Sequence, residues 1–160
     1  MSSFGPDETQ AIGRKLGKLL RSGEMVCLYG ALGSGKTCLV QGLARGLEVK
    51  EEKQVKSPTF MLIREYEGKV PVYHFDVFRL SSGQELEDLG YDEYFYGRGV
   101  TLVEWADRVE EYLPPGRIDI HLIILGEQER RIEVRFPDEL SERIAGLGEL
   151  SSKLKAESSK

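Results

Sequence analysis

A phosphate-binding loop is the segment of this sequence best suited to do chemistry. Its residues are Gly30-Ala31-Leu32-Gly33-Ser34-Gly35-Lys36-Thr37, which fit G-x-x-x-x-G-K-[ST] at every position. The glycines let the backbone approach an oxyanion closely, and successive N–H groups point inward with the positive end of the following helix. Lys36 would reach the β- and γ-phosphates, and the Thr37 hydroxyl would take one position on Mg²⁺. The loop therefore predicts binding of a nucleoside triphosphate.

The flanking residues have the patterns that such a loop requires. Met25 to Tyr29 are apolar throughout, as in a strand buried on both faces. After the loop, apolar residues recur at helical spacing at Leu39, Val40, Leu43 and Leu47. Strand, loop and helix thus stand in the expected order, and we predict that the helix begins near Lys36.

A phosphate loop also needs an acid that holds the metal or its water, usually at the end of a neighbouring apolar strand. Glu104 follows the apolar run from Val100 to Val103, and Asp76 ends the second strand of a predicted hairpin. The alternative for either residue is a solvated acid at a strand end. We expect Glu104 on the metal and Asp76 close to the γ-phosphate. His74, on the same strand face as Asp76 by period-two geometry, is expected to be structural, as is His121.

Two further observations concern the nucleotide. Thr59, in Ser57-Pro58-Thr59, follows a polar loop that could fold over the phosphates, so its hydroxyl could sense the γ-phosphate; the alternative is a turn that merely starts a strand. The chain contains no asparagine, so the Asn-Lys-x-Asp motif by which many GTPases recognise guanine cannot occur. ATP is therefore the expected nucleotide.

The remaining patterns predict an α/β fold. Asp7 is expected to cap a first helix that ends near Ser22-Gly23. Further expected elements are strands at 60–66 and 70–76, with Pro71 at an edge or strand start, short helices within 84–95, a strand at 100–103, a hairpin of 118–125 with 131–136, and a helical pattern from 138 to about 154. We predict one P-loop NTPase-like domain over residues 1–160, with a mixed sheet, a parallel centre, flanking helices and a frayed tail at 156–160.

Composition limits the classes of partner and compartment. The net charge is −5, from 22 basic and 27 acidic side chains, which argues against tight unaided binding to nucleic acid. No apolar run approaches the ~18 residues of a membrane span, and we expect no signal peptide and no membrane association. The two cysteines, Cys27 and Cys38, are expected to be small buried hydrophobes in a reducing compartment. A cytoplasmic location is the expectation.

Taken in order, these motifs resemble the TsaE (YjeE) family, small bacterial ATPases of tRNA threonylcarbamoyladenosine synthesis. The matching segments are Asp7-Glu8-Thr9, Gly30 to Thr37, Ser57-Pro58-Thr59-Phe60, His74 to Leu80 and Val103-Glu104-Trp105. One loop would be weak evidence, whereas the ordered set is specific to this family.

The resemblance implies a role for each matched residue. ATP or ADP would be held by Gly33, Ser34, Gly35, Lys36, Thr37 and Cys38, with Thr9 near the adenine and Arg131 reaching the nucleotide from a distant strand. Mg²⁺ would lie on Thr37 and Glu104. Thr59 would be the switch residue and Asp76 the catalytic acid. The sequence departs from the family pattern at Ala31, where Asp is usual, and at Phe78, where Tyr is usual.

The resemblance also implies a process. TsaE-like proteins join TsaB and TsaD, and their ATP hydrolysis, weak alone and stimulated by partners, is thought to reset the assembly between turnovers while the tRNA is held mainly by those partners. Two other functions remain as alternatives. A small-metabolite kinase would need an Arg-bearing lid, but between Arg108 and Arg130 the chain offers only Arg117. A non-catalytic nucleotide-gated binding module would bind ATP without hydrolysing it.

Overall fold

A seven-stranded sheet organises the part of the chain that the computed structural model describes, residues 1–50, 55–56 and 62–140. The strands are β1 (Ser2–Ser3), β2 (Met25–Tyr29), β3 (Ile63–Glu67), β4 (Pro71–Asp76), β5 (Val100–Glu104), β6 (Ile118–Ile124) and β7 (Arg130–Arg135). Their spatial order is β1-β7-β6-β2-β5-β4-β3. The four central strands, β6-β2-β5-β4, pair in parallel, and the outer pairs are antiparallel. The predicted mixed sheet with a parallel centre is confirmed.

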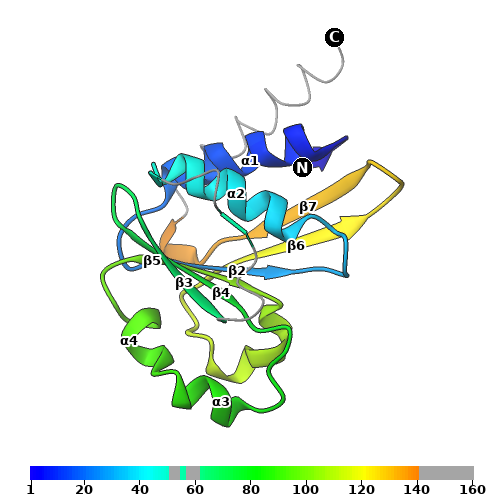
Figure 1. Ribbon diagram of the computed structural model, residues 1–160. Coiled ribbons are helices and arrows are strands. Elements are labelled where there is room, and N and C mark those ends of the chain that lie inside the picture. Colours follow the sequence, from blue (N-terminus) through cyan, green and yellow to red (C-terminus); the bar gives the residue numbers. More distant parts are fainter. Residues whose placement is uncertain (51–54, 57–61, 141–160) are drawn as a thin grey trace.

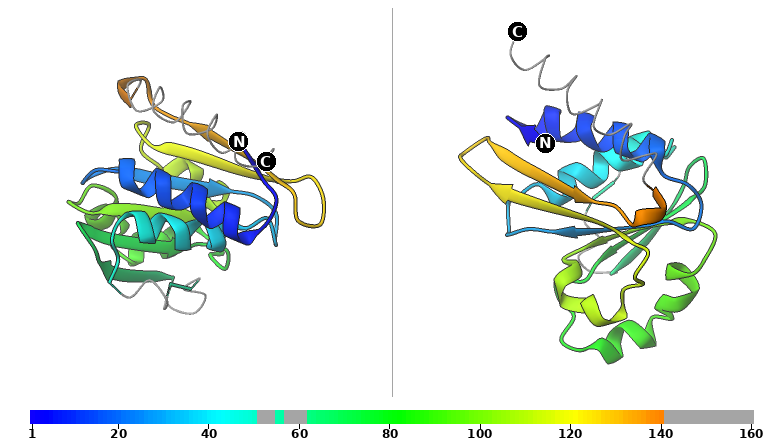
Figure 2. Two further views of the ribbon diagram at one scale, coloured as in Figure 1. Left: turned by 90° about the horizontal axis from the view of Figure 1, so that it is seen from above. Right: turned by 180° about the vertical axis from the view of Figure 1, so that it is seen from behind.

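Helices cover both faces of this sheet (Figures 1 and 2). On one face lie α1 (Pro6–Leu19) and α2 (Lys36–Gly46); on the other lie α3 (Gly83–Asp88), α4 (Tyr91–Phe95) and the 3₁₀ helix η2 (Ala106–Tyr112). A short 3₁₀ turn, η3 (Asp138–Leu140), follows β7. Side chains of β2 alternate between the two resulting cores, with Val26 and Leu28 in one and Met25 and Cys27 in the other. None of the described helices is long and apolar enough to cross a membrane.

The parallel centre brings the chemistry-bearing residues to one edge of the sheet. β2 runs directly into the phosphate loop, and α2 begins at Lys36, as predicted. In the register of the sheet, Glu104 of β5 is opposite both Leu28 of β2 and Asp76 of β4. Because the carboxyl ends of parallel strands meet at the same edge, the loop and both acids lie close together.

Glycines allow α1 and α2 to pack with their backbones in close approach. A Cβ added at Gly13 of α1 would lie 2.5 Å from the Leu39 carbonyl oxygen of α2. A Cβ added at Gly42 of α2 would meet the backbone of Gln10 of α1. Since these neighbours are backbone atoms, they cannot move aside without shifting a helix. The contact fixes α1 against the helix that carries the phosphate loop.

Gly42→Ala is therefore expected to lower the free energy of unfolding by about 1–3 kcal/mol, the usual cost of overpacking a core. This loss would occur although alanine has the higher helix propensity. Gly116→Ala is the control, because a Cβ there meets no atom within 4 Å. Urea denaturation of both variants measures the difference, and equal stability of the two would contradict the packing argument.

Several predicted elements differ from the structure. The N-cap of α1 is Gly5, with Pro6 at the first helical position, and Asp7 lies in the first turn without capping. Pro71 was predicted at a sheet edge or at a strand start. It begins β4, but that strand lies inside the sheet between β5 and β3. Strand β1 was not predicted, and β7 begins at Arg130, one residue before its predicted start. The predicted strand residues 60–61, the helical pattern beyond Leu140 and the tail at 156–160 lie outside the described residues.

Candidate functional site

The phosphate loop has a conformation that requires its glycines. Gly33 and Gly35 have φ of 79° and 103°, in the left-handed region that disfavours side chains. A Cβ at Gly30 would collide with the Ser34 hydroxyl and lie 2.9 Å from the Leu122 carbonyl oxygen. Gly35 is the N-cap of α2, so the free N–H groups of the helix open toward the loop. This is an arrangement suited to an anion.

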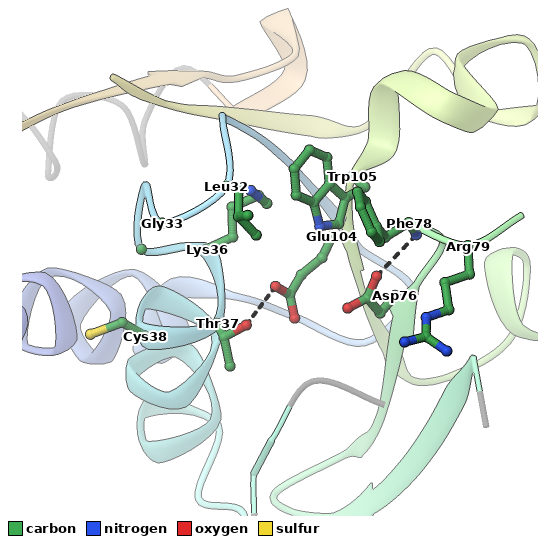
Figure 3. Close-up of a pocket in the computed structure, with 11 residues that line it drawn as sticks. Leu32, Gly33, Lys36, Thr37, Cys38, Asp76, Phe78, Arg79, Glu104 and Trp105 are labelled. Carbon is green, nitrogen blue, oxygen red and sulfur yellow. Dashed lines mark hydrogen bonds between the residues drawn. The ribbon is translucent and has the colours of Figure 1, made fainter. Parts of the chain in front are cut away.

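Two hollows flank the loop. The first, of about 430 Å³, is lined by Leu32, Gly33, Gly35, Lys36, Thr37, Cys38, Asp76, Phe78, Arg79, Glu104 and Trp105, and is drawn in Figure 3. The second, of about 200 Å³, is lined by Gly5, Pro6, Thr9, Gly33, Ser34, Gly35, Cys38, Glu127, Gln128 and Arg130. Three residues of the loop and α2 line both hollows, so the two hollows lie on either side of the same loop. Their combined size suits a ligand with a polar and a less polar end.

Lys36 lines the first hollow and is held by the loop backbone. Its Nζ donates to the Gly30 carbonyl oxygen at 2.7 Å and to that of Ala31 at 3.0 Å, and lies 3.7 Å from the centre of the Trp105 ring. Burial lowers the pKa of the Lys36 amino group, while the nearby carboxylates of Glu104, Asp76 and Asp107 act in the opposite sense. The ammonium is thus supported by backbone dipoles and an aromatic face.

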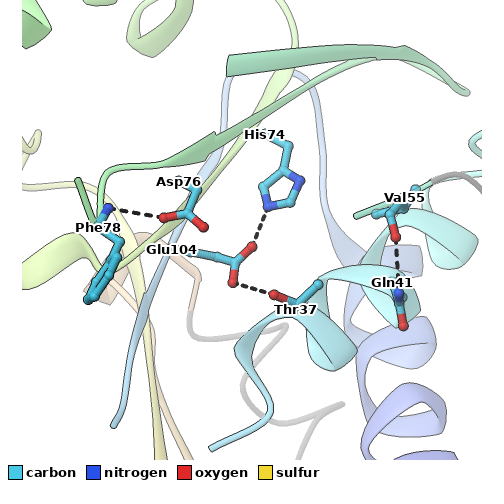
Figure 4. A network of polar contacts seen from close by, with 7 residues as sticks. All are labelled: Thr37, Gln41, Val55, His74, Asp76, Phe78 and Glu104. Atoms are coloured by element: carbon cyan, nitrogen blue, oxygen red, sulfur yellow. Dashed lines mark hydrogen bonds and ion pairs between the residues drawn. The ribbon is translucent and has the colours of Figure 1, made fainter. Parts of the chain in front are cut away.

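The two predicted acids lie beside the loop but make different contacts. Thr37 Oγ1 donates to Glu104 Oε1 at 2.8 Å, and Asp76 Oδ1 accepts from the Phe78 backbone N–H at 3.0 Å (Figures 3 and 4). Both acids are buried. Trp105, in a left-handed conformation with φ of 61°, follows β5 and turns the chain into η2.

His74, which the sequence predicts to be structural, lies directly beside this site. Its Nε2 lies 2.5 Å from Glu104 Oε2, and its side chain is fully buried (Figure 4). The available signal was the two-residue alternation that places His74 on the same strand face as Asp76. That pattern could not show a contact across to β5. His121, by contrast, stacks on Tyr29 with ring centres 4.5 Å apart.

The oxygen donors beside the loop fit Mg²⁺ in a nucleotide site. Such an ion is held by one or two protein oxygens together with phosphate oxygens. Thr37 and Glu104 supply a hydroxyl and a carboxylate in direct contact. Within residues 1–50, 55–56 and 62–140, no group of three or more His, Cys, Asp and Glu could hold a metal by itself. The donor set suits an ion that arrives with its phosphates.

Arg130, one residue before the predicted Arg131, is the arginine that faces the loop. Its guanidinium donates to the carbonyl oxygens of Ser34 and Gly33, both at 3.2 Å, and to that of Gly126 at 2.8 Å. Arg131 is half-exposed and pairs with Glu133 at 3.3 Å. Successive side chains of a strand point to opposite faces, so β7 can present only one of the two arginines. In this structure Arg130 therefore faces the loop, and the nucleotide contact expected of Arg131 stays a prediction.

Arg130→Ala is expected to weaken ATP or ADP binding roughly tenfold, because losing hydrogen bonds from a charged donor costs about 1.5 kcal/mol and frees the loop from the β6–β7 turn. Arg131→Ala is the matched control on the adjacent residue and is expected to leave affinity within about twofold, as for other exposed pairs. Titration calorimetry compares the two. A larger loss in the Arg131 variant would reverse the assignment.

The other predicted ligands have mixed placements. Thr9 is buried beside the second hollow, with its Oγ1 2.7 Å from Ser3 Oγ. Cys38 is half-buried rather than buried, and its Sγ donates to the Pro6 carbonyl oxygen at 3.3 Å; Cys27 is buried as expected, and burial raises the pKa of its thiol. Thr59 lies outside the described residues.

Comparison with known proteins gives a consistent result. A family model described as "Threonylcarbamoyl adenosine biosynthesis protein TsaE" matches residues 4–132. The tRNA threonylcarbamoyladenosine biosynthesis protein TsaE of Bacillus subtilis is 46% identical over 131 residues, covering 81% of this chain and 80% of the relative. The protein of the same name from Treponema pallidum is 44% identical over 132 residues, covering 82% and 96%. A crystal structure of YdiB from Bacillus subtilis matches with a TM-score of 0.76 and 35% identity, covering 94% of each chain.

Proposed function

The chain belongs to the TsaE family of tRNA threonylcarbamoyladenosine biosynthesis proteins, and from this we propose that it is a Mg²⁺-dependent ATPase of that pathway. One observation in this structure supports the proposal independently of family membership. The Glu104 carboxylate accepts the Thr37 hydroxyl at 2.8 Å, directly beside a complete phosphate loop. This pairing of a loop hydroxyl with a strand-end acid is what metal-assisted phosphate chemistry requires.

ATP binds across both hollows in this proposal. The triphosphate lies on the loop and at the N-terminus of α2, where free N–H groups and the helix dipole favour anions. The nucleoside extends into the second hollow, toward Thr9 and Cys38. Adenine is favoured because the guanine-reading Asn-Lys-x-Asp motif cannot occur in a chain without asparagine.

Each residue at the first hollow has a task. Lys36 exchanges its bonds to the Gly30 and Ala31 carbonyls for stronger, charge-assisted bonds to phosphate oxygens. Thr37 and Glu104 would hold Mg²⁺, which would neutralise negative charge on the phosphates. Asp76, opposite Glu104 in the sheet register, orients the attacking water and accepts its proton.

Hydrolysis is slow in the isolated protein and faster with TsaB-like and TsaD-like partners, whose assembly it resets between turnovers. The tRNA is held mainly through those partners, since a chain of net charge −5 cannot neutralise many phosphates alone. The setting is the cytoplasm. Thr59 acts as the switch residue that responds to the γ-phosphate.

Phosphate release from ATP, measured for the protein alone and with both partners, tests this function. The expected result is Mg²⁺-dependent release that the partners accelerate. An intact γ-phosphate after long incubation with Mg²⁺ and partners would instead favour a nucleotide-gated binding module. Transfer of phosphate to a metabolite would favour a kinase, for which Arg117 is a poor lid because it is bonded to Asp119 at 3.0 Å.

A further inference from the structure

His74 is a fully buried histidine to which the proposed reaction assigns no role. It lies on β4 between Val72 and Asp76, on the sheet face that α2 covers, and has 0% relative exposure. The sheet register pairs His74 with Leu102, so its contact with Glu104 is diagonal, two residues further along β5. The two residues are not paired in the sheet, so their contact arises because the two side chains point toward each other.

The partner of His74 is a carboxylate that needs both of its oxygens satisfied. Glu104 is 1% exposed, and a buried charge is costly unless it is hydrogen-bonded. Its Oε1 accepts the Thr37 hydroxyl at 2.8 Å, and its Oε2 lies 2.5 Å from His74 Nε2. The two contacts are on opposite sides of the carboxylate (Figure 4), so together they fix its rotation.

Neighbouring polar groups are engaged elsewhere. Asp76 lies opposite Glu104, but its Oδ1 accepts the Phe78 N–H, and the Lys36 ammonium donates to the Gly30 and Ala31 carbonyls. The His74 Nδ1 is buried without a hydrogen-bond partner among the described residues. A ring without a proton on Nδ1 suits this buried position, because its one N–H is then on Nε2 and can donate a hydrogen bond to Glu104.

We infer that His74 is a positioning residue for Glu104: its Nε2–H holds one carboxylate oxygen so that the other faces Thr37 and the metal side of the loop. This inference rests on the proposed function. Groups that orient a metal ligand from behind typically contribute about 10- to 100-fold in metal affinity or activity. Loss of the donor should therefore affect what depends on Mg²⁺ and leave the rest of nucleotide binding intact.

The test compares His74→Gln with His74→Asn. The Gln side chain can place an amide N–H near the position of Nε2, whereas the shorter Asn places it near Nδ1, too far from Glu104. ADP affinity is measured by calorimetry with Mg²⁺ and with EDTA. We expect His74→Asn to lose about 10- to 100-fold of the Mg²⁺-dependent gain, to keep its affinity in EDTA within about twofold, and to lose kcat with little change in KM. His74→Gln should retain most of each.

Val72→Ala is the matched control, because it removes a buried side chain from the same face of the same strand, two residues away. It should lower stability and leave the Mg²⁺-dependent gain unchanged. If His74→Asn does not fold, His74→Leu, which buries no amide, takes its place. A Mg²⁺ response like that of the wild type in the Asn or Leu variant would overturn the inference, as would an equal loss in Val72→Ala. Absence of any Mg²⁺ response in the wild-type protein would instead defeat the proposed function, and the inference with it.

Discussion

Lys36→Ala is expected to weaken ATP binding by roughly 10- to 150-fold, which corresponds to losing about 1.5–3 kcal/mol from hydrogen bonds to a charged group. The side chain is 5% exposed and lines the hollow, with its Nζ 3.7 Å from the centre of the Trp105 ring (Figure 3). Alanine leaves the loop backbone in place and removes only the ammonium. The loss should therefore appear with ligands that carry β- and γ-phosphates, as measured by calorimetry with ATP and ADP.

Two comparisons make this expectation specific. AMP, which lacks those phosphates, should bind the variant and the wild type about equally. Lys18→Ala removes an exposed lysine of α1 and should leave ATP affinity unchanged. If Lys36→Ala bound ATP as well as the wild type does, the hollow beside the loop would not be a triphosphate site.

The sequence was sufficient for the parts of the fold that depend on local patterns. Met25 to Tyr29 form β2, and the loop glycines have the left-handed backbone that their positions required. The position of both acids beside the loop could be predicted because each ends a strand, and the carboxyl ends of parallel strands share an edge. In each case the physical constraint operates over a few neighbouring residues.

The features that could not be predicted from the sequence depend on contacts between elements that are far apart in the chain. The choice between Arg130 and Arg131 turns on where β7 begins, because a shift of one residue reverses the face that each side chain occupies. His74 looked like a core residue because nothing local indicates that its ring meets Glu104 of another strand. The close approach of α1 and α2 likewise requires glycines on both helices at matching heights.

The contacts of Ala31 and Phe78 bear on the two departures expected from the family resemblance. Ala31 contributes its carbonyl oxygen to Lys36, a contact that any residue at this position could make, so only the charge of the usual Asp is missing. Phe78 packs its ring against Trp105, with centres 4.7 Å apart, and lies 5.0 Å from the Arg108 guanidinium. The ring contacts do not need the hydroxyl of the usual Tyr. The contacts of Ala31 and Phe78 in this structure therefore use no group that an Asp or a Tyr would add.

Glu104→Gln is expected to slow ATP hydrolysis about 100-fold or more, the scale at which loss of one preorganised polar group slows catalysis. The amide keeps the size of the side chain and can still accept the Thr37 hydroxyl, which Glu104 accepts at 2.8 Å. The charge is what changes, so Mg²⁺ should no longer increase nucleotide affinity. In EDTA the variant should bind ATP at least as tightly as the wild type, because a negative charge near the phosphates has been removed.

Asp76→Asn and Glu133→Gln complete this experiment. The Thr37 hydroxyl donates to Glu104, whereas Asp76 accepts the Phe78 backbone N–H, so the Asp76 variant should lose kcat while keeping the Mg²⁺ dependence of ADP binding. Glu133 pairs with Arg131 away from the loop, and its variant should match the wild type in both measurements. Single-turnover rates and calorimetry with and without Mg²⁺ separate the two acids. Normal hydrolysis by Glu104→Gln would move the metal assignment from Glu104 to Asp76, since these are the two buried carboxylates that line the hollow.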